Sequence, residues 1–338
     1  MTGKEEWNVP SVDEILGRIV PRRKIDGNSA VLLPYKAPGV PDYDALAAHV
    51  RRTAEAGLTP AVNMDTGYVN LLTDEEREAV LRVTREALGP GRPFIAGAFI
   101  EGKAGDPVGL YQREIDTIRE HGGTPIIFQC SAMKALNGPD LVKMYQAIAK
   151  GNGPLYAFEL GEMFAPFGAI WDDDVARGIM EIPEIAGYKH SSLDRQVEWR
   201  RLELKRRIRP EFKIFTGNDL AIDMVMYGSD YLLGLSTFAP DVFAYRDRLW
   251  AEGSSRFYQV NDVLQYLGEF AFRHPTPAYK HSAAQFLWLR GWSATDLTHP
   301  NGHVRPESDK EILRLILERI ERIASEAASA KAESGRAS

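Results

Sequence analysis

A short apolar run bounded by turn residues recurs about every 30 residues, which is the length of one strand followed by one helix. Six such runs start between Ser29 and Glu184, and two more follow at tighter spacing. Parallel strands covered on both faces have this continuous apolar character. The runs are SAVLLPY, PAVNMD, PFIAGAF, PIIFQC, PLYAFEL, EIAGYKH, FKIFTGND and YLLGLST.

The stretches between the runs have the apolar spacing of amphipathic helices. The clearest, TDEEREAVLRVTREALG, begins with Thr73 and Glu76 in the arrangement of a capping box and ends at Gly89. A capping box satisfies free N–H groups at a helix start, and a glycine commonly follows a helix end. The sequence therefore predicts alternating strands and helices.

Eight alternating units predict a (β/α)8 TIM barrel. An open, doubly wound sheet is the alternative, but the segment after the first run, LLPYKAPGV, lacks the glycine-rich phosphate-binding fingerprint of such folds. We expect an N-terminal extension over residues 1–28, the barrel over 29–245, a C-terminal helical segment over 246–325 and a disordered tail over 326–338. Three helices are expected in the C-terminal segment, over Tyr258–Arg273, Lys280–Arg290 and from Ser308 to about residue 325.

Composition limits the partners and the location. The formal charge of −6, with 41 basic and 47 acidic residues, gives no general attraction to nucleic acid or to an anionic membrane. The single cysteine, Cys130, excludes an internal disulfide and is consistent with a reducing compartment. No apolar stretch is long enough to span a bilayer. We expect a cytoplasmic protein with a small-molecule partner, and no nucleic-acid or membrane partner.

The active site of such a barrel lies at the carboxyl ends of its strands. Only one lysine stands there, Lys189 in the run EIAGYKH. Strand alternation places Ile185, Gly187 and Lys189 on one face, pointing into the barrel mouth. Burial there disfavours the ammonium form, and a neutral amine can attack a carbonyl group to form an imine. Tyr156, near the end of the preceding run, is the nearest phenol for proton transfer.

The same lysine has a second interpretation with equal weight on these grounds. Burial of an ammonium group costs free energy unless the group is paired. In this interpretation Lys189 forms an ion pair with Asp65 or Glu159 that closes the end of the barrel. The residues alone leave both interpretations open.

Several motifs, in this order and spacing, resemble those of the pyruvate-type class I aldolases, the family of dihydrodipicolinate synthase and N-acetylneuraminate lyase. DTGYVNLLTDEEREAV is similar to the family's carboxylate-binding loop and the helix after it, PLYAFELG to its strand-five tyrosine segment, and GYKHSSLDR to its Schiff-base strand. FTGND and AYKHSAAQFLWLRG resemble its seventh strand and C-terminal helix. The resemblance implies that Lys189 forms the imine, that Tyr156 relays protons, and that the protein is a homo-oligomer, a dimer or tetramer.

Departures from the family pattern restrict the activity. Asp65 and Tyr68 replace a threonine and a glutamate of the loop, so that Thr66 and Gly67 alone remain to hold a carboxylate. The Asp65 carboxyl group repels an anionic substrate unless it points away or is protonated. The segment QCSAMKA replaces the synthase's paired tyrosine, and the arginine expected after Tyr156 is absent. A true dihydrodipicolinate synthase is therefore not expected.

Three hypotheses follow. The first is a Schiff-base lyase, a retro-aldolase or a dehydratase, acting on a 2-oxo acid or a hydroxylated oxo or sugar acid without a cofactor. The second is a small-molecule-binding barrel that has lost the family chemistry. The third, metal-assisted hydrolysis through His190, Asp65 and Glu159, is weaker, and no metal site is expected. The lyase hypothesis assigns catalysis to Lys189 and Tyr156, and substrate binding to Asp65, Thr66, Gly67, Glu159, Asn218 and Ser236.

Overall fold

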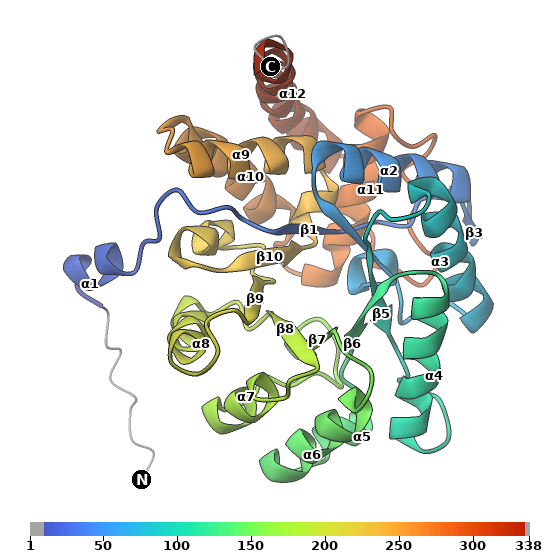
Figure 1. Ribbon diagram of the computed structural model, residues 1–338. Coiled ribbons are helices and arrows are strands. Elements are labelled where there is room, and N and C mark those ends of the chain that lie inside the picture. The colour runs from blue at the N-terminus through green and yellow to red at the C-terminus, as the bar shows by residue number, and fades with distance from the viewer. Residues whose placement is uncertain (1–9, 335–338) are drawn as a thin grey trace.

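Eight parallel strands close into a barrel in the computed structural model, which describes residues 10–334 (Figure 1). The first strand pairs with both the second and the last, so the sheet has no open edge. The predicted (β/α)8 architecture is confirmed. In barrel order the strands are β1 (Gly27–Ala30), β10 (Asp230–Leu233), β9 (Lys213–Thr216), β8 (Ile185–His190), β7 (Leu155–Glu159), β6 (Thr124–Ile127), β5 (Ile95–Ala98) and β4 (Thr59–Val62).

Helices cover the outside of the barrel between successive strands (Figure 1). Between β9 and β10 the connection is the 3-10 turn Ile222–Tyr227, which explains why these two runs follow one another so closely in the sequence. The outer helices are α2 (Tyr43–Ala56), α3 (Asp74–Leu88), α4 (Pro107–Glu120), α5 (Ser131–Lys134), α6 (Gly138–Ala149), α7 (Asp173–Met180), α8 (Arg195–Ile208) and α9 (Pro240–Glu252).

Helix α3 starts and ends where the sequence predicted. The Thr73 side chain accepts the N–H of Glu76, and the Glu76 carboxylate accepts the N–H of Thr73 at 2.9 Å, which completes the capping box. Gly89 follows the last turn with φ of +70°, a conformation that a residue with a side chain adopts at a cost.

Two apolar layers hold the barrel. The larger lies between the strands and the outer helices. The smaller fills the barrel interior and includes Phe128, Phe158 and Phe215 from neighbouring positions of the sheet. A polar side chain that points inward at the carboxyl end is therefore surrounded by aromatic groups.

The start of the barrel differs from the expected one. Strand β1 begins at Gly27, two residues before the expected barrel start at Ser29. Tyr35 belongs to a separate hairpin formed by β2 (Tyr35–Ala37) and β3 (Val40–Pro41) rather than to the first barrel strand. The run SAVLLPY therefore contains one strand end and the start of the next element.

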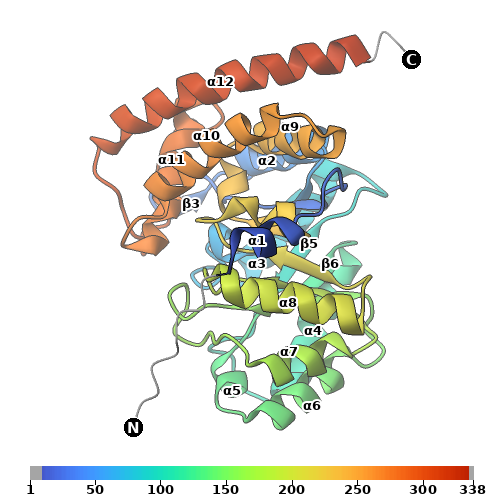
Figure 2. The ribbon, with the colours of Figure 1, turned by 90° about the vertical axis from the view of Figure 1, so that its left-hand side faces the viewer.

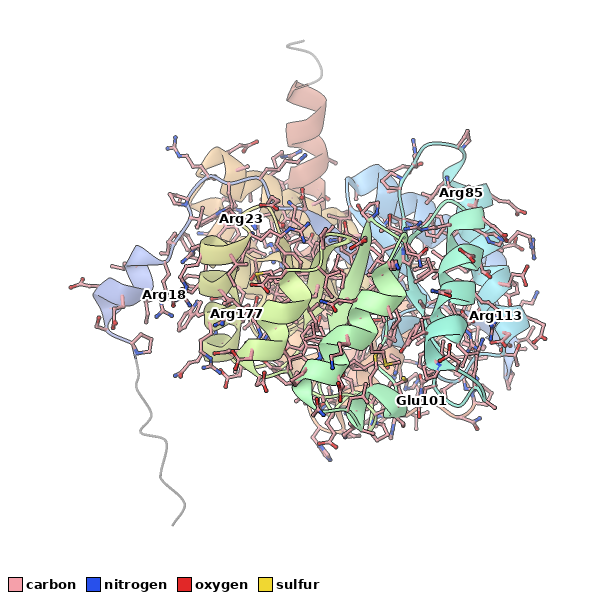
Figure 3. The ribbon with its side chains drawn as sticks, turned by 60° about the horizontal axis from the view of Figure 1, so that its bottom comes forward. Arg18, Arg23, Arg85, Glu101, Arg113 and Arg177 are labelled. Carbon is pink, nitrogen blue, oxygen red and sulfur yellow. The ribbon has the colours of Figure 1, made fainter. Side chains whose placement is uncertain are left out.

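The segment before β1 packs along the amino ends of the last strands. After α1 (Val12–Gly17), Arg23 donates to the Asp230 carboxylate at 2.8 Å and to the Ser229 carbonyl at 2.6 Å. Figure 3 labels Arg23 on this segment, among the charged side chains that cover the outer surface. Residues 1–9 of the expected extension lie outside the described part of the chain.

Three helices follow the barrel, as predicted: α10 (Arg256–Ala271), α11 (Tyr279–Leu289) and α12 (Asp309–Ser334). Helix α12 lies across α9, α10 and α11 (Figure 2) and continues to Ser334, past the expected end near residue 325. The expected boundary at residue 245 falls inside α9. Of the expected tail, residues 335–338 lie outside the described residues. None of the helices described within residues 10–334 combines the length and apolar character needed to cross a membrane.

Candidate active site at the carboxyl end of the barrel

Lys189 lies inside the barrel near the carboxyl end of β8, paired in register with Phe158 of β7. A shift in the β7–β8 register near Ala186 removes Ile185 from the inner face, so only Gly187 and Lys189 share it as predicted. The lysine is 7% exposed. Its stem passes beside Gly217, where a Cβ would lie 2.6 Å from the lysine Cε. The missing side chain at residue 217 therefore makes room for the amine.

The Lys189 amine is buried without a close acidic partner. Its Nζ makes no hydrogen bond and no ion pair within the described residues, and it lies 4.5 Å from the centre of the Phe158 ring. Burial lowers the pKa of Lys189 below its ordinary value, while the more distant Asp219 and Asp65 carboxylates act in the opposite direction. The ion pair of Lys189 with Asp65 or Glu159, the second interpretation of the sequence, is not formed.

Asp65 instead pairs with residues from α11. Its carboxylate accepts from the Tyr279 hydroxyl at 2.9 Å and from Lys280 Nζ at 2.9 Å. The Thr66 hydroxyl lies 2.8 Å from the Tyr279 oxygen, so a chain of donors runs from Thr66 through Tyr279 to Asp65. Asp65 begins the 3-10 turn Asp65–Gly67 after β4. These contacts join the loop after β4 to the start of α11 in the C-terminal helical segment.

Asp219 is the acidic group that the sequence interpretation missed. It follows β9 and is 3% exposed, and its carboxylate accepts the N–H of Leu235 at 2.7 Å. Burial raises the pKa of Asp219 to about 7, although the positive charge of Lys189 acts to lower it. A carboxyl group with this pKa exchanges its proton at neutral pH. The signal was present as the last residue of FTGND, where Asn218 was selected instead.

Tyr156 does not lie beside Lys189, contrary to the expectation. It pairs in register with Gly187, two residues before Lys189 on β8, which displaces it by about 7 Å toward the amino end. Burial raises the pKa of Tyr156, and the charged groups that modulate it are Lys213, Asp26 and Asp230 at the amino ends of the strands. The phenol therefore faces the opposite end of the barrel.

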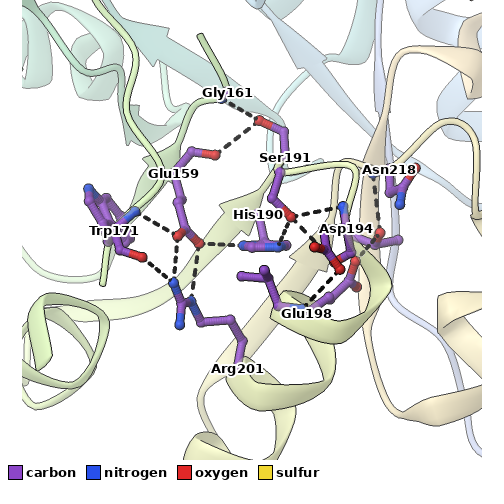
Figure 4. Close-up of polar contacts among 12 residues, drawn as sticks. Glu159, Gly161, Trp171, His190, Ser191, Asp194, Glu198, Arg201 and Asn218 are labelled. Carbon is purple, nitrogen blue, oxygen red and sulfur yellow. Dashed lines mark hydrogen bonds and ion pairs between the residues drawn. The ribbon is translucent and has the colours of Figure 1, made fainter. Parts of the chain in front are cut away.

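Glu159 was expected to bind substrate but faces the outer helices. Its carboxylate contacts His190 Nδ1, accepts from Arg201 Nη2 at 2.9 Å and accepts the N–H of Trp171 at 3.0 Å (Figure 4). The side chains of Glu159 and His190 are fully buried there. Strand alternation explains this, because Glu159 follows the inward-facing Phe158 and His190 follows Lys189.

The proposed metal ligands are consequently divided between two sides of the sheet. Asp65 lies at the mouth, whereas Glu159 and His190 lie outside the strands. Within residues 10–334 no group of three or more histidine, cysteine or acidic side chains is arranged to hold a metal ion. The set of His190, Asp65 and Glu159 does not form a site.

The other predicted residues make contacts within the fold that shape the mouth. Asn218 accepts the N–H of Leu220 at 3.1 Å and so forms the turn that carries Asp219. The Ser236 hydroxyl is fully buried, 2.8 Å from the Leu233 carbonyl oxygen and 2.9 Å from Ser29 Oγ. The Gly67 N–H donates to the Met64 carbonyl at 3.0 Å.

An aromatic wall lines the mouth from the end of β5 to the loop after β7. The rings of Phe158, Phe128, Phe99 and Phe167 form a series of edge-to-face contacts with centroid distances of 4.9, 5.7 and 5.9 Å. Phe167 comes from the loop after β7. Gln129 holds this loop by accepting the Ala169 N–H at 2.7 Å and donating to the Ala169 carbonyl at 2.9 Å.

Tyr279 and Lys280 were also missed. They lie in AYKHSAAQFLWLRG, which resembled a family helix but suggested no role for either residue. Their contacts with Asp65 join residues more than 200 positions apart. The signals available were the polar residues at the start of α11, with Tyr279 and Lys280 first among them, in a helix that is buried over most of its length.

A comparison with protein families identifies the family of this chain. A model of the family described as "Protein of unknown function (DUF993)" matches residues 29–303. The chain belongs to this family. The matched range contains every mouth residue described above, from Asp65 to Lys280. The match therefore runs from within β1 through the rest of the barrel and past the end of α11.

One matched sequence and several solved structures confirm the resemblance to the dihydrodipicolinate synthase and N-acetylneuraminate lyase superfamily. A 4-hydroxy-tetrahydrodipicolinate synthase from Kosmotoga olearia is 26% identical over 63% of this DUF993 chain and 70% of its own. The dihydrodipicolinate synthase of Thermotoga maritima superimposes with a TM-score of 0.74 at 20% identity, covering 88% of this chain and 99% of its own. A prophage protein of the dihydrodipicolinic acid synthase family from E. coli K12, solved in complex with pyruvate, gives a TM-score of 0.76 at 16% identity, with 88% and 98% covered.

Proposed function

We propose that this DUF993 protein is a Schiff-base lyase in which Lys189 condenses with the carbonyl group of a hydroxylated oxo compound. The observation that carries the proposal is the Lys189 amine, buried at the carboxyl end of a barrel strand without an ion pair in the described chain. Burial lowers its pKa, which increases the fraction of the nucleophilic free amine.

The reaction begins when the lone pair of Nζ attacks the carbonyl carbon to give a carbinolamine. Loss of water with uptake of one proton leaves a protonated imine that withdraws electrons from the neighbouring bonds. In a retro-aldol cleavage, a base takes the proton of the β-hydroxyl group, the C–C bond breaks, and an enamine remains. In a dehydration, a base removes the α-proton, and the β-hydroxyl group leaves as water after receiving a proton.

Asp219 is the proposed proton acceptor and donor for these steps. Its pKa of about 7 lets it exist in both forms at neutral pH. In its ionised form it also stabilises the positive imine, because the Lys189 and Asp219 charges interact. This assignment replaces Tyr156, which lies toward the amino end of the barrel.

Substrate hydroxyl groups are proposed to bind at the Asp65 turn. Asp65 accepts from Tyr279 and Lys280 and keeps further acceptor capacity, since an ionised carboxylate has about four acceptor sites. The proposed substrate classes are a 2-oxo acid, a hydroxylated oxo compound and a sugar acid.

Reduction of the imine tests the proposal. The full chain is incubated with borohydride and a panel of carbonyl compounds, and the labelled residue is located by peptide mass mapping. We expect a stable secondary amine on Lys189 with at least one compound, and none when borohydride or the carbonyl compound is omitted. Absence of any adduct on Lys189 across the panel would overturn the lyase proposal.

A ligand-binding barrel without catalysis is the alternative, and one observation favours it. The residue beside Lys189 on β7 is Phe158, which has no proton to exchange. Such a protein is stabilised by ligands that it leaves unconverted. A rise in melting temperature with a compound that is recovered unchanged and leaves no reduced adduct would support the alternative.

We also propose that the protein forms a homo-oligomer, a dimer or tetramer, in the cytoplasm. Apolar side chains on the outer faces of α10 and α12 support it, since Tyr258, Tyr266 and Leu315 are 51%, 54% and 59% exposed. Light scattering of the purified protein measures the mass, and a monomer at micromolar concentration would contradict this part.

A further inference from the structure

We infer that the compound that condenses with Lys189 carries a hydroxyl-bearing carbon where a 2-oxo acid carries its carboxylate, so that the substrate is a neutral hydroxylated ketone or aldehyde. This inference rests on the proposed imine chemistry and specifies its substrate class. It depends on which hydrogen-bonding groups and charges remain free around the amine.

The Asp65–Gly67 turn has few donors left for a carboxylate. The Thr66 hydroxyl is engaged with the Tyr279 oxygen at 2.8 Å, and the Gly67 N–H is engaged with the Met64 carbonyl at 3.0 Å. The Tyr279 hydroxyl in turn donates a hydrogen bond to the Asp65 carboxylate. The Thr66 hydroxyl and the Gly67 N–H, two of the groups that the sequence suggested for carboxylate binding, are therefore used within the fold.

Charges around the turn also disfavour an anion. Lys280 is neutralised by Asp65 at 2.9 Å. Arg77, which packs over the ring of Phe99, donates to the carbonyl groups of Val69 and Leu72 and pairs with Asp74. A substrate carboxylate would thus meet the negative charge of Asp65 and find these two cations already paired.

Asp65 is instead suited to receive hydroxyl groups. Tyr279 and Lys280 occupy two acceptor positions of its carboxylate, and about two of the four remain. The Asp65 side chain keeps 16% of its surface exposed at the mouth, whereas its partner Lys280 keeps 8%. A hydroxyl group on the carbon next to the carbonyl would donate to this carboxylate, where a carboxylate would be repelled.

The aromatic wall of the mouth is also unsuited to an anion. Phe158 lies directly beside the amine, and Phe128, Phe99 and Phe167 continue the apolar wall. Burying an ionised carboxylate against such rings without a partner is strongly unfavourable. A neutral substrate with hydroxyl groups toward Asp65 and C–H groups toward the wall avoids this cost.

Hydroxyacetone and pyruvate form a matched pair of probes, because they share a three-carbon skeleton and differ in a hydroxymethyl group against a carboxylate. Each is titrated against the full chain with borohydride, and the fraction of Lys189 converted is measured by mass spectrometry. Free lysine treated in parallel corrects for the different intrinsic reactivity of the two carbonyl groups. After this correction we expect half-conversion at about tenfold lower concentration of hydroxyacetone, or less.

Asp65→Asn tests the origin of the preference while keeping the shape of the side chain. Loss of the negative charge leaves Lys280 available for an anion, so we expect labelling by pyruvate to increase about tenfold relative to hydroxyacetone. Asp116→Asn removes the same charge from the exposed face of α4 and should leave the ratio unchanged.

The outcomes separate the two proposals. Equal or preferred labelling by pyruvate in the natural protein would overturn the neutral-substrate inference while leaving the lyase proposal intact. Absence of labelling by these and all other carbonyl compounds would overturn the lyase proposal and this inference with it. An unchanged ratio in Asp65→Asn would show that the Asp65 charge does not select the substrate.

Discussion

Lys189 on β8 lies directly beside Phe158 on β7, with its Nζ 4.5 Å from the centre of the phenylalanine ring. The ring removes water from the amine and so contributes to the lowered pKa, although its face also attracts an ammonium group by about 1 kcal/mol. A phenylalanine exchanges no proton. In the proposed lyase, acid–base chemistry near the amine therefore falls to the carboxyl groups of the mouth.

Replacing Asp219 by asparagine should change how stability depends on pH. The folded-state pKa of about 7 lies above the ordinary value of 3.8. Between these values the folded protein keeps a proton that the unfolded chain has released, so the free energy of unfolding falls as pH rises through this window. Asp219→Asn should remove that fall, on the order of a few kcal/mol, in urea unfolding measured across the window. Asp116→Asn serves as the control, and an identical slope in the natural protein and Asp219→Asn would contradict the assignment.

Lys189→Met should abolish borohydride labelling without loss of stability. The methionine fills a similar volume and leaves no amine to desolvate, so the free energy of unfolding should be unchanged or raised by about 1 kcal/mol. Lys134→Met is the matched control, because Lys134 pairs with Glu162 at the exposed surface. Labelling that persists in Lys189→Met would mean that another lysine forms the adduct.

Gly217→Ala should displace the amine while leaving the barrel folded. The added Cβ would lie 2.6 Å from Lys189 Cε and 3.0 Å from the His190 carbonyl oxygen, closer than van der Waals contact allows. Because a displacement of about 1 Å in a reacting group can cost about 100-fold in rate, imine formation should fall by that order. Gly17→Ala in α1, where a Cβ meets no atom within 4 Å, should label normally. Equal labelling rates in both variants would refute the positioning of the amine by Gly217.

Glu159→Gln should affect stability and not imine formation. The substitution leaves buried Arg201 with Asp173 as its remaining carboxylate partner and removes one charged hydrogen-bond partner, at a cost of about 1–3 kcal/mol in the free energy of unfolding. Asp140→Asn, which breaks an exposed ion pair with Lys143, should cost less than about 1 kcal/mol. Lys189 should still be labelled in folded Glu159→Gln. Loss of labelling at unchanged stability would instead indicate that Glu159 binds substrate.

Much of the architecture was predictable from the sequence because it depends on local patterns. The spacing of apolar runs gave eight strands, and the capping residues Thr73 and Glu76 placed the start of α3. Lys189 was recognisable because it is the only lysine at the carboxyl end of a predicted strand. Its inward direction followed from alternation with Gly187.

Errors within the candidate site came from register and direction. Tyr156 and Phe158 both point inward, and only the pairing of β7 with β8 decides which of them lies at the level of Lys189. Glu159 is one residue further along and therefore points to the opposite face of the sheet, where it meets Arg201 from α8. A shift of one or two positions along a strand thus changes the chemistry that surrounds the amine.

The sequence by itself determined that the chain forms a (β/α)8 barrel and that Lys189 stands in its mouth, because both follow from the order and spacing of neighbouring residues. Only the tertiary structure decided that Asp65 meets Tyr279 and Lys280 and that the charge of Asp219 acts on the pKa of Lys189. These contacts join residues far apart in the chain. Burial, which alters the pKa values of Lys189 and Asp219, exists only when the barrel has closed around them.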